Sequence, residues 1–178
     1  CSNWTARKSR DPKINYFVWF GLQYLLKEYL VDYFNDNFFN RPKEEVMREY
    51  KRRIETSIGP LPTYEHIAYV HDLGYLPVVI KSLPEGTRVP IRVPSMVIYN
   101  TDPNCYWLTN FLESFISCIL WQPSTSATIA SRYRELMDSW AEKTGIDKEF
   151  VKFQGHDFSF RGMSSFETSY LSAAGHLL

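Results

Sequence analysis

The residues with the greatest capacity for chemistry lie close together in the segment 155–162, which reads Gly-His-Asp-Phe-Ser-Phe-Arg-Gly. Five of these residues lie within the six positions 156–161, and Gly162 interrupts the pattern: His156, Asp157, Phe158, Phe160 and Arg161. An aromatic ring beside a fixed cation suits a flat heterocycle that carries a phosphate or lies next to one. The alternative is a strand that buries both phenylalanines and ends in an exposed arginine, because short motifs often match by chance.

A second candidate segment, residues 3–10, places Arg7, Lys8 and Arg10 among hydroxyl-bearing residues. Such a cluster can hold a phosphate through charge-assisted hydrogen bonds. A solvated, charged loop explains the same residues equally well.

The composition narrows the class of protein. A chain of 178 residues with 44% hydrophobic and 22% charged residues can form one well-buried domain, or one domain and part of another. Twenty basic residues balance 20 acidic ones, so no overall field favours nucleic acid or an anionic membrane.

The three cysteines form no metal-binding spacing, and no apolar stretch is long enough to span a bilayer. Sparse, unpaired cysteines favour a reducing compartment, so we expect a soluble, cytoplasmic protein. The chain starts without Met and stops inside an expected helix, which indicates a fragment of a longer protein.

The hydrophobic pattern predicts three helices in the first part of the chain, over 16–30, 42–57 and 63–74. Alternating apolar residues and prolines between 76 and 99 predict short strands of one small antiparallel sheet. The two histidines of the third helix, His66 and His71, lie five residues apart, and we interpret them as surface or packing residues rather than ligands.

The second part of the chain is predicted to contain two helices and then a strand followed by a helix. Asp102-Pro103 starts an apolar helix that Gln122-Pro123 ends, and Glu113 within it is interpreted as a structural hydrogen-bonding residue. A separate amphipathic helix follows over 126–144, a strand over 149–153, and a last helix with a capping box at Ser164 and Glu167. The inward face predicted for the amphipathic helix consists of Ile129, Tyr133, Met137 and Trp140.

Three segments together resemble nicotinamide phosphoribosyltransferase: 83–90, which begins Leu-Pro-Glu-Gly; 100–110, which reads Asn-Thr-Asp-Pro-Asn-Cys-Tyr-Trp-Leu-Thr-Asn; and 156–165. Phe20 to Tyr24, Ala127-Thr128 and Ser131-Arg132 add support in the same order along the chain. The resemblance covers nearly all 178 residues, and two of its segments are long and chemically unusual.

This resemblance implies the fold of a type II phosphoribosyltransferase, with an α+β domain beside an α/β barrel. Residues 1–148 would then form a mixed helical α+β domain with a small antiparallel sheet. Residues 149–178 would be the first strand-helix unit of a truncated barrel. The family works as a homodimer with shared active sites.

The resemblance also implies roles for five residues. Phe158 would stack on the nicotinamide ring, and Arg161 would be the catalytic arginine that faces the phosphate-bearing substrate. His156 and Phe153 would line the tunnel behind the pocket, although the family often has tyrosine at the latter position. Arg7 would reach the diphosphate in the partner subunit's site, in a loop that departs from the vertebrate form.

The implied reaction joins nicotinamide to 5-phosphoribosyl 1-diphosphate, giving nicotinamide mononucleotide and diphosphate, with Mg²⁺ accompanying the diphosphate substrate and ATP as a candidate activator. Other parts of the family's site would lie outside this chain, so the chain alone should be inactive. Two alternatives stay open: a nicotinate phosphoribosyltransferase of the same fold, and a non-catalytic folding or dimerisation module.

Overall fold

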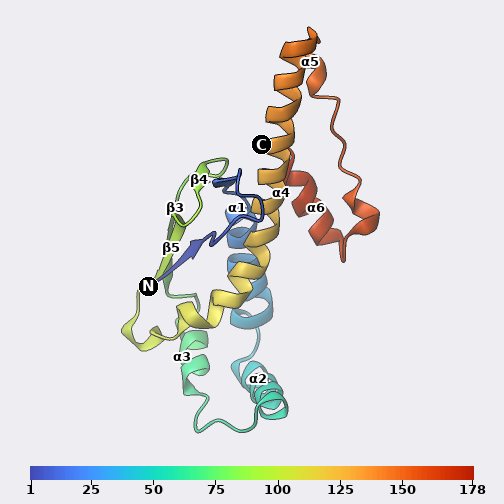
Figure 1. Ribbon diagram of the computed structural model, residues 1–178. Coiled ribbons are helices and arrows are strands. Elements are labelled where there is room, and N and C mark those ends of the chain that lie inside the picture. The colour runs from blue at the N-terminus through green and yellow to red at the C-terminus, as the bar shows by residue number, and fades with distance from the viewer. The chain divides into compact units, whose positions relative to one another are not determined.

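The computed structural model describes all 178 residues (Figure 1). They divide into two compact units. The first unit contains Cys1–Ser2, Gln23–Ile80 and Ile98–Glu113, and the second contains Asn3–Leu22, Lys81–Val97 and Ser114–Leu178. Five short strands form two sheets. One has the strand order β1 (Ser2–Thr5), β5 (Pro94–Asn100), β3 (Val78–Ser82), and in the other β2 (Tyr16–Val18) pairs antiparallel with β4 (Arg88–Pro90). Helices and small sheets together fit the predicted α+β class.

The first unit starts with a continuous helical segment of unusual geometry. The helix predicted over 16–30 begins only at Leu22, because Tyr16–Val18 is the strand β2. A short α1 (Leu22–Tyr24) continues as π-helix in η1 (Leu25–Tyr33) and η2 (Asn35–Phe39). Helices α2 (Lys43–Ser57) and α3 (Glu65–Leu73) follow close to their predicted bounds, and α3 ends where Gly74 adopts a left-handed φ of 74°.

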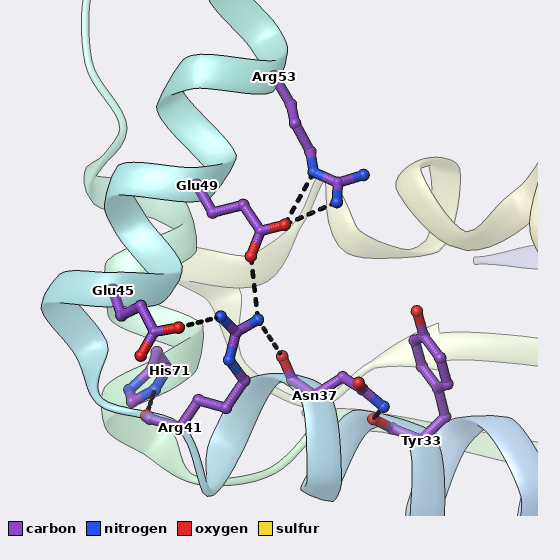
Figure 2. A network of polar contacts seen from close by, with 7 residues as sticks. All are labelled: Tyr33, Asn37, Arg41, Glu45, Glu49, Arg53 and His71. Atoms are coloured by element: carbon purple, nitrogen blue, oxygen red, sulfur yellow. Dashed lines mark hydrogen bonds and ion pairs between the residues drawn. The ribbon is translucent and has the colours of Figure 1, made fainter.

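A network of charged side chains connects the end of the π-helical segment to α2 (Figure 2). The guanidinium of Arg41 contacts Glu45 at 2.5 Å and Glu49 at 3.0 Å, and Glu49 also binds Arg53 at 2.6 Å. Hydrogen bonds from Arg53 and Arg41 hold the pKa of Glu49 below its ordinary value. The predicted acidic start of α2 is therefore used for pairing as well as for the helix dipole.

Both histidines of α3 are packing residues, as predicted. His71 Nε2 lies 3.0 Å from the carbonyl oxygen of Arg41 (Figure 2). The ring of His66 packs edge-on against Trp107 at 5.0 Å, and burial lowers the pKa of His66. A lowered pKa keeps this imidazole neutral, which suits an aromatic contact.

The predicted helix start at Asp102 is confirmed in altered form. The Asp102 carboxylate accepts a hydrogen bond from the backbone N–H of Asn104, and the residues that follow form a 3₁₀ turn, η3 (Pro103–Cys105). The long helix α4 (Leu108–Thr144) begins three residues later and ends before Gly145, whose φ is 73°. Within it, Glu113 is exposed, so its carboxylate does not need the buried hydrogen-bonding role predicted for it.

The prediction that Gln122-Pro123 separates two helices is wrong, because α4 runs through Pro123 without a break. A proline inside a helix loses one backbone hydrogen bond and costs about 3 kcal/mol. Here Pro123 is fully buried, and its ring packs against Gly21. Tertiary packing around Pro123 offsets the local tendency of a proline to end the helix.

The inward face predicted for residues 126–144 is wrong for three of its four residues, and only Met137 is half-buried. Ile129, Tyr133 and Trp140 are each about half exposed or more, at 49%, 61% and 56%. The buried residues in this part of α4 are instead Ala127, Thr128 and Ala141. A hydrophobic stripe identifies the apolar face of a helix but not which neighbour covers it.

The strand predicted over 149–153 is replaced by a one-turn helix, α5 (Lys148–Val151), whose N-cap Asp147 accepts a hydrogen bond from the N–H of Glu149. The side chain of Asp147 thus accepts a hydrogen bond from a backbone N–H at the helix start, whereas a strand would need a neighbouring strand for its backbone hydrogen bonds. The last helix, α6 (Phe166–Gly175), starts one residue later than predicted: its capping box joins Ser165 and Thr168. None of the helices is long and apolar enough to cross a membrane.

Candidate functional site

The candidate segment connects α5 to α6 and is mostly exposed. After Lys152 the chain is irregular up to Phe158, and then forms a 3₁₀ turn, η4 (Ser159–Gly162), that carries Arg161. Phe153 and Phe158 are 68% and 76% exposed, and His156 and Arg161 are exposed too. The alternative reading, a strand that buries Phe158 and Phe160, is therefore wrong for this structure.

Asp157 anchors this segment through hydrogen bonds. Its Oδ1 accepts the backbone N–H of Ser159 at 2.7 Å, which starts the 3₁₀ turn that positions Arg161. Partial burial raises the pKa of Asp157, but hydrogen bonds from Ser159 and Ser172 and the nearby His176 outweigh it, so that the pKa lies below its ordinary value. The surroundings of Asp157 in the fold thus favour the charged form of its carboxylate.

The structure brings only two of the predicted site residues into direct contact. The rings of His156 and Phe158 meet edge-on with their centroids 6.4 Å apart. Arg161 forms no ion pair, and its guanidinium is free to bind an anion. Phe153 lies beyond the end of α5, where its N–H bonds to the carbonyl oxygen of Phe150.

A hollow of 430 Å³ lies beside the candidate segment and was not predicted from the sequence. Phe160 and Tyr170 line it together with Asp157, Ser169 and Leu177. The ring of Phe160 also packs on that of Phe166 at 5.3 Å. A sequence signal existed, since the aromatic residues at positions 166 and 170 are four apart and share one face of α6.

Arg7 lies elsewhere, in the loop that follows β1. It lines a hollow of 560 Å³, and every other cation that lines it, namely Lys8, Arg10 and Arg92, is also exposed. None of the residues lining this hollow belongs to the segment 153–161. The structure therefore presents the predicted site residues as two separate groups.

Two segments that support the family resemblance, the one that begins at Phe20 and the one that contains Thr128, lie close to each other within the second unit. The buried Thr128 Oγ1 accepts the backbone N–H of Val18 at 2.8 Å. Ser124 bonds to both backbone groups of Phe20, accepting from its N–H at 3.2 Å and donating to its carbonyl oxygen at 2.9 Å. The turn at 84–87 contacts the same strand end, where Glu85 accepts the N–H of Gly21 at 2.8 Å. These residues thus join β2 to α4 and to the turn.

A cluster of charged residues that the sequence did not reveal fixes β2 and β4 on α4. Glu135 accepts a hydrogen bond from the hydroxyl of Tyr16 at 2.9 Å, pairs with Arg88 at 2.6 Å and also pairs with Arg132. Arg88 lies over the ring of Tyr16, with its Cζ 5.1 Å from the centroid. The contacts of Tyr16, Arg88 and Arg132 outweigh partial burial and hold the pKa of Glu135 below its ordinary value.

Comparison with known proteins agrees with the resemblance seen in the sequence, although no family model matches the chain. A nicotinamide phosphoribosyltransferase of Acinetobacter baylyi is 46% identical over 185 aligned residues, which cover 99% of this chain and 36% of that protein. Over almost its whole length this chain is therefore similar to a nicotinamide phosphoribosyltransferase.

Other relatives carry the same name at greater distance. The nicotinamide phosphoribosyltransferase of Xanthomonas campestris pv. campestris is 30% identical over 174 residues, covering 96% of this chain and 35% of that protein. That of Mycoplasma genitalium is 34% identical over 105 residues, or 57% of this chain and 23% of that protein. The chain thus spans about a third of the length of the Acinetobacter and Xanthomonas proteins. This share is consistent with an N-terminal portion of such a protein.

Proposed function

We propose that the protein carrying this chain is a nicotinamide phosphoribosyltransferase. In this reaction the ring nitrogen of nicotinamide forms a bond to C1 of 5-phosphoribosyl 1-diphosphate while the bond from C1 to the diphosphate oxygen breaks. The products are nicotinamide mononucleotide and diphosphate. The observation that carries the proposal is the similarity to a protein of that name, 46% identical over 99% of this chain.

The exposed segment 153–161 supports a binding role within this activity. Phe158 would lie against one face of the nicotinamide ring and orient it for in-line attack, which is a positioning effect. Its ring is available because 76% of the residue is exposed. His156, edge-on to Phe158 at 6.4 Å, and Phe153 would line the space behind the ring.

Arg161 supplies positive charge to the same segment. The displacement builds negative charge on the leaving diphosphate, and preorganised cations stabilise such charge well. The turn that carries Arg161 is anchored by the hydrogen bond from the N–H of Ser159 to Asp157. Arg161 would contact the phosphate-bearing substrate, which makes it the catalytic residue of this chain.

Mg²⁺ would enter this reaction as part of the diphosphate substrate. No group of three or more His, Cys, Asp or Glu residues of the chain is arranged to hold a metal ion. The residues present therefore do not fit a resident metal centre, and the role proposed for this chain is to bind the anion by its arginines.

Further properties of the family extend the proposal to the whole protein. It would act in the cytoplasm as a homodimer, with Arg7 contributing to the partner subunit's site and with ATP as an activator. Residues 149–178 would lead into an α/β barrel, with 1–148 as the preceding domain.

The test is a direct assay with the purified protein in its natural length. Incubation with 5-phosphoribosyl 1-diphosphate, Mg²⁺ and nicotinamide should yield nicotinamide mononucleotide and diphosphate, detected by chromatography. A parallel reaction with nicotinate separates the base preferences, and isothermal titration with each base tests binding alone. Formation of nicotinate mononucleotide only would contradict the proposed substrate, and binding of neither base would indicate a non-catalytic module.

A further inference from the structure

The turn that connects β4 to β5 has an unusual backbone. It spans 90–93 and is closed by a hydrogen bond from the N–H of Val93 to the carbonyl oxygen of Pro90 at 3.0 Å. Its third residue, Arg92, has a φ of 71°, in the left-handed region that glycine normally occupies at this turn position. Such a backbone costs a non-glycine residue about 1–3 kcal/mol, so an observed outlier is a reason to look for a function.

Two backbone hydrogen bonds attach this turn to both ends of the loop that carries Arg7. The N–H of Arg92 donates to the carbonyl oxygen of Ala6, and the N–H of Ile91 donates to that of Asn15, both at 2.9 Å. Inside the loop, the N–H of Ile14 bonds to the carbonyl oxygen of Asp11 at 3.0 Å. The backbone around the hollow is therefore held in place from several directions.

The hollow formed in this way has a volume of 560 Å³ and a strongly basic lining. Arg7, Lys8, Arg10 and Arg92 line it, no carboxylate does, and none of the four cations is paired with one elsewhere. Ser9 and Asn15 add neutral polar groups to the same wall. Four unpaired cations repel one another, and an anion with several charges would relieve that repulsion.

We propose that Arg92 is an anion-binding residue of this hollow, and that it acts with Arg7 on the diphosphate group of the substrate. Arginine suits this task because its planar guanidinium can donate two parallel hydrogen bonds to phosphate oxygens. Arg7 and Arg92 both line the same hollow. The inference rests on the proposed function, but assigns to Arg92 a role that the family resemblance gave only to Arg7.

The position offers a substitution that removes the guanidinium without harm to the backbone. In Arg92→Gly the new residue suits a φ of 71° better than arginine does, so the thermal midpoint should stay the same or rise. Lys13→Ala is the matched control, because it removes a cation from the same loop that does not line the hollow.

The experiment titrates the purified natural-length protein with inorganic diphosphate by calorimetry at several salt concentrations. We expect Arg92→Gly to weaken diphosphate binding by about tenfold or more and to reduce its salt dependence, with Lys13→Ala close to wild type. Unchanged diphosphate affinity in Arg92→Gly, no diphosphate binding by the wild type, or equally tight binding of sulfate would overturn the inference.

The outcomes for this inference and for the proposed function are separable. If no nicotinamide mononucleotide forms but diphosphate binds in an Arg92-dependent manner, the hollow is an anion site and the proposed reaction is wrong. If nicotinamide mononucleotide forms and Arg92→Gly binds diphosphate normally, the reaction stands and the role of Arg92 is wrong.

Discussion

Gly21 lies so close to Pro123 that a Cβ atom built at position 21 would be 2.6 Å from the Cγ of the proline ring. The glycine has a φ of 104°, and its N–H donates to the side chain of Glu85. Gly21, just after β2, and Pro123, inside α4, are therefore packed so closely that a side chain at position 21 would not fit without a shift. The contact explains how α4 keeps a proline in its interior: the ring is the surface on which the chain after β2 packs.

We expect Gly21→Ala to destabilise the protein by on the order of 2–4 kcal/mol, because it adds both backbone strain and a steric overlap. Urea unfolding followed by circular dichroism measures the effect. Gly59→Ala is the matched control, since Gly59 has a similar φ of 96° but nothing within 4 Å of the added Cβ. An equal loss in both variants would mean that contact with Pro123 adds nothing.

Thr128 joins β2 to α4 through one buried hydroxyl. Its Oγ1 accepts the N–H of Val18 and donates to the carbonyl oxygen of Ser124 at 2.6 Å. Thr128→Val keeps the shape but leaves the N–H of Val18 without a partner, which should cost about 1–3 kcal/mol.

The control for this substitution is Thr125→Val. Thr125 is exposed, and its hydroxyl donates only to the carbonyl oxygen of Trp121 within the same helix. Its loss should change the free energy of unfolding by about 0.5 kcal/mol or less. Chemical denaturation of both variants decides the matter, and similar losses would argue against a special role for Thr128.

Much of the fold follows from local signals that the sequence displays. Gly74 and Gly145 mark helix ends as predicted, and α2 has its acidic first turn. The failures occur where contacts distant in sequence decide the outcome. The sequence predicts a helix end at Pro123, but the packing of this residue against Gly21 allows the helix to continue. It also predicts Tyr16 in a helix, but Tyr16 pairs with Pro90 in a sheet.

For the candidate site, too, some features could be predicted from the sequence and others could not. The types of His156, Phe158 and Arg161 predict a segment that suits ligand binding, and the structure shows these residues exposed. The position of these residues in space could not be predicted from the sequence: the approach of Arg92 to the loop of Arg7 has no local pattern. That approach depends on hydrogen bonds between residues far apart in the chain, from Arg92 to Ala6 and from Ile91 to Asn15.

Asp157 should give the protein a measurable pH dependence of stability. Its pKa in the folded state lies below its ordinary value of 3.8, so its charged form stabilises the fold. That contribution is complete above the ordinary pKa and is lost as pH falls through the lower value of the folded state.

Asp157→Asn tests this dependence. The variant should be less stable than wild type at neutral pH, and the difference should shrink as the pH is lowered past 3.8. Thermal midpoints measured from neutral pH to pH 2 in a matched buffer series give the comparison. A difference that stays constant over the whole range would show that the charge of Asp157 does not stabilise the fold.

Phe158 offers the sharpest test of the candidate site, because it is 76% exposed and contributes little to packing. Phe158→Ala should leave the unfolding midpoint nearly unchanged and raise the KM for nicotinamide by about tenfold or more, since a stacked ring contributes about 1–3 kcal/mol. Steady-state kinetics of the natural-length protein measure it, with Phe150→Ala as the control at an exposed phenylalanine outside the segment. An unchanged KM in Phe158→Ala would remove this residue from the nicotinamide pocket and with it the role proposed for the whole segment.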